Sequence, residues 1–361
     1  MAQLGQLVFT GISGLILTDE EKKFIEKEDI GGVIFFTKNY ESPAQLAELV
    51  NSIQMLRKEY PLFIATDHEG GRVIRFKKNF TQFPPMLDIA RLDSPKIFFD
   101  VATIMSEELL ACGVNINLAP VCDIWNNELN KIIWDRAFGT DHETVSRFIS
   151  SMIRGFQTSG LMSCAKHFPG HGNTIKDSHF DLPIIKKPMK DIREEELQPF
   201  SKAIKARVDI IMMAHIIVEE IDPELPCSLS PKAHDLLRNE LKYKGLILSD
   251  DMQMKAITDH HGTGEAAMMA IKAGSDLVEY RDMEEAMKGL EGLKKAQKDK
   301  TIKANDFSDR LTRVEEAKKK YFTDYKPIYA PDIEKKFNRK ATQAFINDLR
   351  LKIADKISQK S

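Results

Sequence analysis

Residues 246–252 read Leu-Ile-Leu-Ser-Asp-Asp-Met, a short apolar run that ends in a serine and two acidic residues. An apolar run of this length, bounded by turn-forming residues, is typical of a buried strand in a parallel sheet. Similar runs recur through the first 280 residues, with charged segments of helical spacing between them. The eight strands that we expect are 7–11, 32–36, 62–66, 115–120, 163–167, 209–214, 246–250 and 276–280.

The alternation of strands and helices predicts an α/β fold, a (β/α)8 TIM-like barrel. Eight strand–helix repeats in this length fit a barrel better than a doubly wound sheet. The intervening helices are expected at 19–27, 43–59, 95–112, 142–159, 193–206, 231–240 and 264–273. After Tyr280 the pattern is helical only, at 283–298, 307–322 and 341–358. We therefore expect a single barrel domain with closing helices over residues 1–325, and a basic helical C-terminal extension over 326–361 that packs on the barrel.

Composition and charge exclude several classes of protein. The chain has 361 residues, of which 42% are hydrophobic and 29% charged, the balance of a soluble globular protein. A formal net charge of −2 gives no sign of a nucleic-acid or membrane-surface partner. The four cysteines lack metal-binding or disulfide-framework spacing, and neither a leader peptide nor an 18-residue apolar stretch is apparent. The expected location is the cytoplasm.

Polar residues gather where a barrel of this kind carries its active site. Six of them fall at or just beyond the carboxyl end of an expected strand, the end at which (β/α)8 enzymes build their sites. These residues are Asp67, Asp123, His167, His215, Asp250 and Glu279.

Residues 166–179 read Lys-His-Phe-Pro-Gly-His-Gly-Asn-Thr-Ile-Lys-Asp-Ser-His, with three histidines and one aspartate on a predicted loop. One interpretation is a metal site made of His167, His171, Asp177 and His179. The other is an acid/base pair in which Asp177 orients His179 and favours its protonated, charged form. Because neither a His-x-His nor a His-Glu-x-x-His pattern is present, we favour the acid/base pair and expect no metal.

Two further segments carry candidate residues. In a regular strand Asp250 and Asp251 point to opposite sides, so only one can face the barrel mouth. A single buried aspartate at a barrel strand end could act as a nucleophile, and the alternative role of capping the following helix suits Asp251 better. The block that begins at Asp67 contains a glycine pair and two arginines but no phosphate-binding motif. Its carboxylate and guanidinium groups suit hydroxyl-rich ligands.

Seven ordered motifs together resemble glycoside hydrolase family 3, specifically its bacterial single-domain β-N-acetylglucosaminidases that recycle cell-wall fragments. The resemblance covers roughly residues 4–320, and two small departures, Ala137 and Asn173, fall outside the expected catalytic positions. The motifs lie at 67–73, 118–123, 136–139, 166–179, 213–215, 249–252 and 273–278.

The resemblance implies a role for each matching residue. Asp250 is then the nucleophile, His179 the proton donor and acceptor, and Asp177 its partner. The sugar contacts implied are Asp67, Arg75, Arg136, Lys166 and His167. No cofactor is implied.

The expected function is that of a retaining exo-β-N-acetylglucosaminidase (β-N-acetylhexosaminidase) acting on cell-wall muropeptides, as a monomer without nucleic-acid or membrane partners. Four alternatives stay open: substrate-assisted hydrolysis through the 2-acetamido group, a β-N-acetylglucosaminide phosphorylase, another family 3 β-glycosidase, and a non-catalytic sugar-binding protein.

Overall fold

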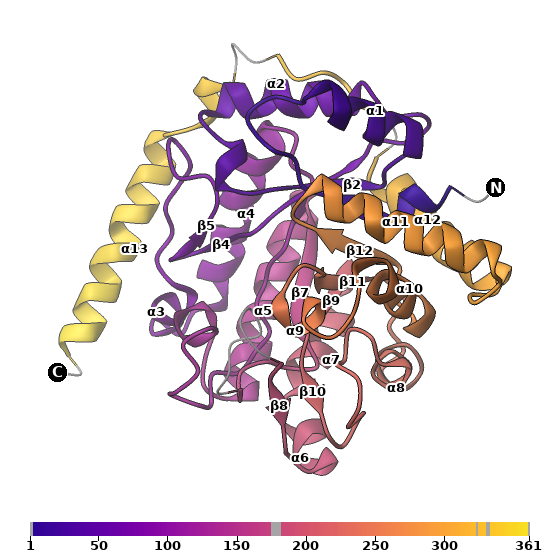
Figure 1. Cartoon of the computed structure of the whole chain (residues 1–361). Coiled ribbons are helices and arrows are strands. Elements are labelled where there is room, and N and C mark those ends of the chain that lie inside the picture. The colour runs from indigo at the N-terminus through magenta and orange to yellow at the C-terminus, as the bar shows by residue number, and fades with distance from the viewer. Residues whose placement is uncertain (1–2, 175–181, 323, 330–332, 360–361) are drawn as a thin grey trace.

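Eight parallel strands close into a barrel at the centre of the molecule, with helices around it (Figure 1). The computed structural model describes residues 3–174, 182–322, 324–329 and 333–359. Around the barrel the strands follow the order β1-β12-β11-β9-β7-β6-β3-β2, and β1 pairs with both β2 and β12. Their bounds are β1 (Val8–Thr10), β2 (Gly32–Phe35), β3 (Phe63–Thr66), β6 (Ile116–Asn117), β7 (Met162–Phe168), β9 (Ile210–Met213), β11 (Leu246–Asp251) and β12 (Leu277–Tyr280). The predicted (β/α)8 barrel is confirmed.

The helices that surround the barrel begin where the sequence provides caps. Thr18 and Glu21 form a reciprocal capping box at the first helix, and Ser42 and Asp141 each accept a backbone N–H at the start of another. The helices are α1 (Asp19–Glu28), α2 (Pro43–Gln54), α3 (Met86–Ala90), α4 (Pro95–Ala111), α5 (His142–Thr158), α6 (Met189–Glu194), α7 (Leu197–Lys205), α8 (Pro231–Asp235), α9 (Lys255–Thr258), α10 (Thr263–Ala273), α11 (Met283–Lys298), α12 (Ala304–Tyr321) and α13 (Lys340–Ser358).

Three helices differ from the prediction. The helix expected over 43–59 ends at Gln54, whose side-chain amide bonds both backbone groups of Leu62 and turns the chain back toward β3. The helix expected over 193–206 is divided into α6 and α7, because Glu195 leaves the helical conformation. The helix expected over 231–240 continues from α8 as one π-helical segment, Leu236–Glu240.

Two short strand pairs outside the barrel were not predicted. β4 (His68–Gly70) and β5 (Val73–Ile74) form a hairpin directly after β3, and β8 (Ile184–Ile185) pairs with β10 (Ile217–Val218). Runs of two or three residues are too short to show a hydrophobic period. The hairpin matters for the site, because it folds the segment after Asp67 back over the barrel mouth.

The C-terminal helix α13 lies along the outer side of the barrel (Figure 1). It contacts α3, and its Ile346, Leu349 and Ile353 are buried. Leu351 is exposed on the other face. In the described part of the chain no helix is both long and apolar enough to cross a lipid bilayer.

His68, in strand β4 of the hairpin, points into the core, and its ring makes no hydrogen bond within the described part of the chain. The side chain is fully buried, both ring nitrogens lack a partner among the described residues, and the ring packs against Phe76 and Phe80 at centroid distances of 6.0 and 5.4 Å. Burial lowers the pKa of His68 to about 3. The folded protein therefore holds this ring neutral where the unfolded chain, with a pKa near 6.5, would protonate it.

We expect His68→Phe to make the fold less sensitive to acid. A folded-state pKa below the unfolded value gives stability that is present above about pH 6.5 and lost as the pH falls toward 3. Removing this group should flatten the dependence of the unfolding free energy on pH by about 1.4 kcal/mol per pH unit between pH 6 and 4. Urea titrations of both proteins at pH 7, 6, 5 and 4 measure it, and parallel curves would contradict the assignment.

Candidate active site

A cavity of about 910 Å³ opens at the carboxyl ends of the barrel strands. Its polar lining comes from the carboxyl ends of β7, β11 and β12 and from the segments that follow β2, β3, β6, β7 and β12. Phe36, Val73, Ile133, Met212 and Met254 contribute apolar walls. A concave site with apolar walls and a few convergent polar groups is the usual form of a small-ligand pocket.

Lys166 is the centre of an ion network on the floor of this cavity. Its Nζ lies 2.7 Å from Asp67 Oδ1 and 2.7 Å from Glu69 Oε1, and the lysine side chain is only 3% exposed. Arg75 Nη2 lies 2.6 Å from the second oxygen of Asp67. Burial alone would raise the pKa of Asp67, but Lys166 and Arg75 outweigh it and hold that pKa well below its usual value. Asp67 is therefore a carboxylate.

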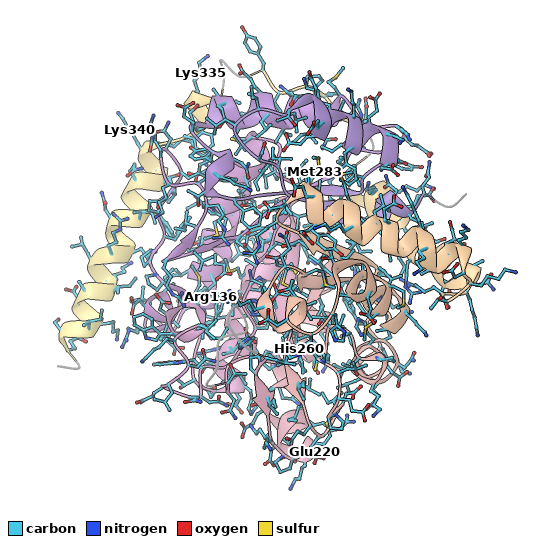
Figure 2. The ribbon with its side chains drawn as sticks, in the orientation of Figure 1. Arg136, Glu220, His260, Met283, Lys335 and Lys340 are labelled. Carbon is cyan, nitrogen blue, oxygen red and sulfur yellow. The ribbon has the colours of Figure 1, made fainter. Side chains whose placement is uncertain are left out.

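Arg136 holds the other end of the network through a two-point contact with Glu69. Its Nε and Nη2 lie 2.8 Å from the two carboxylate oxygens, and Arg136 lies near the middle of the molecule (Figure 2). Burial would raise the pKa of Glu69, but Arg136 and Lys166 lower it to about 2. Glu69 was not among the predicted site residues, although it stands two positions after Asp67 in the same motif.

The network also explains why the hairpin matters. β3 ends at Thr66, so Asp67 lies in the turn into β4, Glu69 lies in β4 and Arg75 follows β5. The segment 67–75 thus contributes three side chains to the network. They meet Lys166, which comes from β7, and Arg136, which comes from the segment after β6. Paired charges in fixed positions present a rigid set of hydrogen-bonding groups to a ligand.

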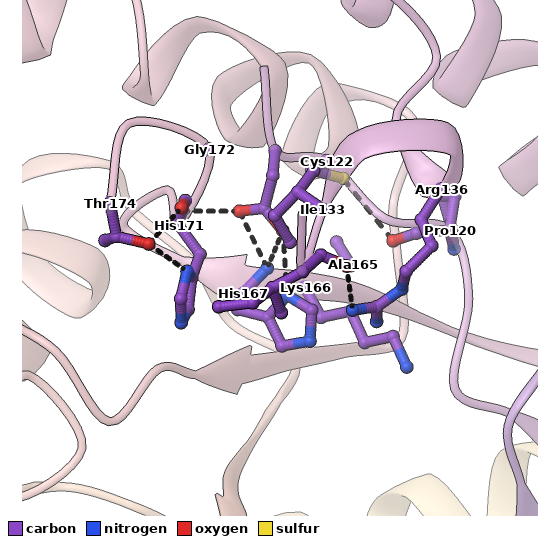
Figure 3. A network of polar contacts seen from close by, with 12 residues as sticks. Pro120, Cys122, Ile133, Arg136, Ala165, Lys166, His167, His171, Gly172 and Thr174 are labelled. Atoms are coloured by element: carbon purple, nitrogen blue, oxygen red, sulfur yellow. Dashed lines mark hydrogen bonds and ion pairs between the residues drawn. The ribbon is translucent and has the colours of Figure 1, made fainter. Parts of the chain in front are cut away.

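His167 is oriented by a buried aspartate behind the cavity wall. Asp123 Oδ2 lies 2.7 Å from His167 Nδ1, and Asp123 Oδ1 accepts a 2.6 Å hydrogen bond from the backbone N–H of His171 (Figure 3). Asp123 is 0% exposed and does not line the cavity. With Nδ1 directed at the carboxylate, Nε2 is the nitrogen of His167 left for a ligand.

The start of the 166–179 loop is fixed by further buried contacts. The side-chain amide of Asn130 donates to the carbonyl oxygens of His171 and Gly172. Figure 3 shows Thr174 beside His171, with Thr174 Oγ1 2.8 Å from His171 Nδ1. Burial, and to a smaller extent the nearby His167, lowers the pKa of His171 to about 4. His171 is thus a neutral residue at the cavity wall.

Asp250 lies at the end of β11 and lines the cavity. Its Oδ1 accepts a 2.8 Å hydrogen bond from the backbone N–H of Asp251. Burial would raise the pKa of Asp250, but the neighbouring His167 and His215 and this hydrogen bond lower it. A buried carboxylate that keeps its charge and faces a cavity is a suitable nucleophile.

The prediction that only one of the two aspartates reaches the barrel mouth is wrong. The pairing of β11 with β12 shifts register between Leu248 and Asp251, and both Asp250 and Asp251 line the cavity. Such a bulge breaks the alternation of side chains. Asp251 pairs with Arg281 Nε at 2.6 Å, and burial raises its pKa to about 6 despite that partner.

The expected capping role of Asp251 is also wrong. Met254 is the N-cap of α9, so Asp251 lies too early to cap that helix. Its carboxylate instead accepts the backbone N–H of Gln253 and closes a turn.

Of the six polar strand ends, four line the cavity and two support it. Asp67, His167, Asp250 and Glu279 belong to the first group. His215 belongs with Asp123 to the second, since its ring lies 2.7 Å from Ser228 Oγ and 3.0 Å from the backbone oxygen of Asp251. The predicted sugar contacts Asp67, Arg75, Arg136, Lys166 and His167 all line the same cavity.

Asp177 and His179 lie outside the described residues, so the structure does not test their positions. The described part of the chain contains no group of three or more His, Cys, Asp or Glu side chains that could hold a metal ion. All four cysteines are buried without a disulfide bond.

The family model "Glycosyl hydrolase family 3 N terminal domain" matches residues 1–317. A protein named Beta-hexosaminidase from Nitrosomonas eutropha is 39% identical over 282 residues, which cover 76% of this chain and 80% of that protein. A Beta-hexosaminidase from Idiomarina loihiensis is 36% identical over 283 residues, covering 77% of this chain and 83% of that protein.

Two solved structures share the fold. The family 3 β-N-acetylglucosaminidase from Paenibacillus sp. str. FPU-7 superposes with a TM-score of 0.92 at 32% identity, covering 96% of this chain and 67% of that one. NagZ from Neisseria gonorrhoeae, solved in complex with N-trifluoroacetyl-D-glucosamine, superposes with a TM-score of 0.79 at 28% identity, covering 95% and 96%.

Proposed function

Because the chain belongs to glycosyl hydrolase family 3, it is a glycosidase, and we propose that it removes terminal non-reducing β-linked N-acetylglucosamine with retention of configuration. The observation that carries this proposal is the cavity at the barrel mouth, where the carboxylate of Asp250 faces the same space as the ion network of Lys166. The names of the relatives, Beta-hexosaminidase and β-N-acetylglucosaminidase, support the choice of sugar.

The proposed reaction is a double displacement. Asp250 forms a bond to the anomeric carbon as the bond to the leaving oxygen breaks, and His179 gives its proton to that oxygen. A water then attacks the anomeric carbon, loses its proton to His179 and releases Asp250. The low pKa of Asp250 supports its role as the attacking group, because only the carboxylate is nucleophilic.

We propose that Asp67, Arg75, Arg136, Lys166 and His167 bind the sugar. Their contacts with one another and with Glu69 and Asp123 already hold them in place, so binding orders few side chains. Carboxylates and guanidinium groups can each engage neighbouring sugar hydroxyls at two points.

We propose that the protein works in the cytoplasm and that its natural substrate is a muropeptide derived from the cell wall. Arg72 and Arg281 line the cavity with partly exposed guanidinium groups, and each pairs through Nε with one aspartate, Asp135 or Asp251. Their remaining N–H donors suit an aglycone with carboxylates. We further propose that residues 1–325 form the catalytic unit, with 326–361 as an appended tail.

The function is tested by release of p-nitrophenol from its β-N-acetylglucosaminide and its β-glucoside, with and without phosphate and with and without a chelator. Turnover of the acetamido sugar alone, unchanged by chelator and by phosphate, supports the proposal. Release of sugar 1-phosphate that requires phosphate would establish a phosphorylase instead. No turnover of either glycoside would overturn the proposal.

Asp177→Asn tests the proposed acid/base pair. The proton donor matters most when the leaving group is a poor one, because an activated aryl oxygen departs without help. We therefore expect a loss of at least about 100-fold on alkyl or sugar leaving groups and a much smaller loss on p-nitrophenol, measured as kcat/KM. Equal losses on both would show that Asp177 does not assist proton transfer.

A further inference from the structure

Glu279 is a cavity-lining carboxyl group for which the proposed reaction has no use. The side chain is 4% exposed and comes from β12, directly beside the strand that carries Asp250. One oxygen, Oε2, is inaccessible to solvent and has no hydrogen-bond partner within the described part of the chain. A buried polar atom left unpaired is costly, so a position that keeps one in a binding cavity calls for an explanation.

The backbone fixes this side chain on the floor of the cavity. The N–H of Glu279 donates to Ser249 Oγ at 3.1 Å, and its carbonyl oxygen accepts the N–H of Met252 at 2.9 Å. The next residue, Tyr280, packs the opposite way, toward Gly289 of α11. Alternation along β12 therefore turns Glu279 into the barrel mouth.

The groups that face Glu279 favour its uncharged form. Asp67 on the β3 side and Asp250 and Asp251 on the β11 side are negative neighbours, while the charge of Lys166 is already shared by Asp67 and Glu69. Burial first, and then these three aspartates, raise the pKa of Glu279 well above its usual value. A neutral carboxyl group offers one O–H donor and one C=O acceptor.

We propose that Glu279 binds one hydroxyl group of the glycone ring, as a neutral donor and acceptor on the floor of the cavity. This inference rests on the proposed function, because it places the sugar over Asp250. A sugar hydroxyl both donates and accepts, and a neutral carboxyl group can satisfy both roles at once. The charged groups of the Lys166 network can satisfy only one role each. Glu279 thus helps select which sugar is accepted.

The test compares Glu279→Gln with Glu279→Leu on the p-nitrophenyl β-N-acetylglucosaminide and on its 3-deoxy, 4-deoxy and 6-deoxy forms. Glutamine keeps a donor and an acceptor, so its kcat/KM should stay within about threefold of the wild type. Leucine should lower kcat/KM by about tenfold or more on the parent sugar. On one deoxy sugar, the one without the bound hydroxyl, the leucine penalty should vanish.

Two measurements show whether the loss is one of binding rather than of folding. Glu279→Leu removes an unpaired buried oxygen, so its midpoint of thermal unfolding should equal or exceed that of the wild type. The infrared carbonyl band of a protonated carboxyl group should be present in the wild type at pH 7 and absent in Glu279→Gln. The infrared comparison does not require that the leucine variant folds.

The inference is overturned if the leucine variant keeps full activity, if its loss is the same on all four sugars, or if the wild type lacks the protonated band. A large loss in Glu279→Gln that grows with poor leaving groups would instead make Glu279 a proton donor. These outcomes assume an active wild type. A wild type that cleaves no N-acetylglucosaminide overturns the proposed function as well, and is thereby distinguished from a failure of Glu279 alone.

Discussion

Replacing Asp250 with alanine should reduce kcat by about 10⁴-fold or more on every β-N-acetylglucosaminide, because it removes the atom that bonds to the anomeric carbon. Azide, which is small and anionic, should enter the space left by the carboxylate and restore part of the turnover of an activated aryl glycoside. Attack from that side gives the α-glycosyl azide. Product analysis by NMR distinguishes this product from the β-azide expected if the 2-acetamido group were the nucleophile.

Asp251→Asn is the matched control, because the two aspartates are adjacent and line the same cavity. With a slow fluorosugar, both the wild type and Asp251→Asn should accumulate a covalent adduct on the peptide that contains residue 250, whereas Asp250→Ala should not. An Asp250→Ala enzyme that keeps most of its activity, or a wild type that forms no adduct, would count against the double displacement and favour the substrate-assisted route.

The second large effect is expected for Lys166→Met. This change leaves Asp67 and Glu69 buried without their shared cation, and removing one partner of a buried ion pair costs about 3–5 kcal/mol. Since Arg75 and Arg136 still neutralise one carboxylate each, we expect the lower end, about 3 kcal/mol of unfolding free energy. Activity should fall with it, because Asp67 and Glu69 lose their position. Urea denaturation and kcat/KM measure the two effects.

Lys318→Met provides a control with the same chemistry at the opposite end of the barrel. Lys318 is also buried, but its Nζ bonds the neutral Gln6 at 2.7 Å, and burial lowers its pKa to about 7. Replacing a buried lysine whose Nζ bonds a neutral amide by an apolar side chain of similar length should cost far less stability than Lys166→Met, and should leave activity unchanged. Equal losses in the two variants would show that the ion network has no special part in stability.

The barrel could be predicted because its strands are continuous apolar runs with polar ends, which is how strands buried on both faces appear in a sequence. The six polar strand ends were found by the same rule. Which of them line the cavity and which support it from behind could not be predicted, because Asp123 and His215 have the same sequence context as Asp67 and Asp250. Only the packing shows that Asp123 and His215 stand behind the wall and hold His167 and the Asp251 turn.

The remaining errors have local causes. A register shift between two strands has no counterpart in the spacing of residues, so Asp250 and Asp251 were assigned to opposite faces. Glu69 was missed because the sequence does not distinguish a buried glutamate that contacts two cations from one that forms an ion pair on the surface. Its bidentate contact with Arg136 joins residues that are 67 positions apart, and no spacing rule reports such a contact.

The ion network around Lys166 draws its members from β7 and from the segments that follow β3 and β6, and these three strands are neighbours in the barrel. Asp250 and Glu279 come from β11 and β12, a second pair of neighbours on the far side of β9. The barrel thus separates the charged groups that we propose bind the sugar from the carboxylate that we propose reacts with it. On this proposal, substitutions in the Lys166 network can change how the sugar is held without moving Asp250, which lies on β11.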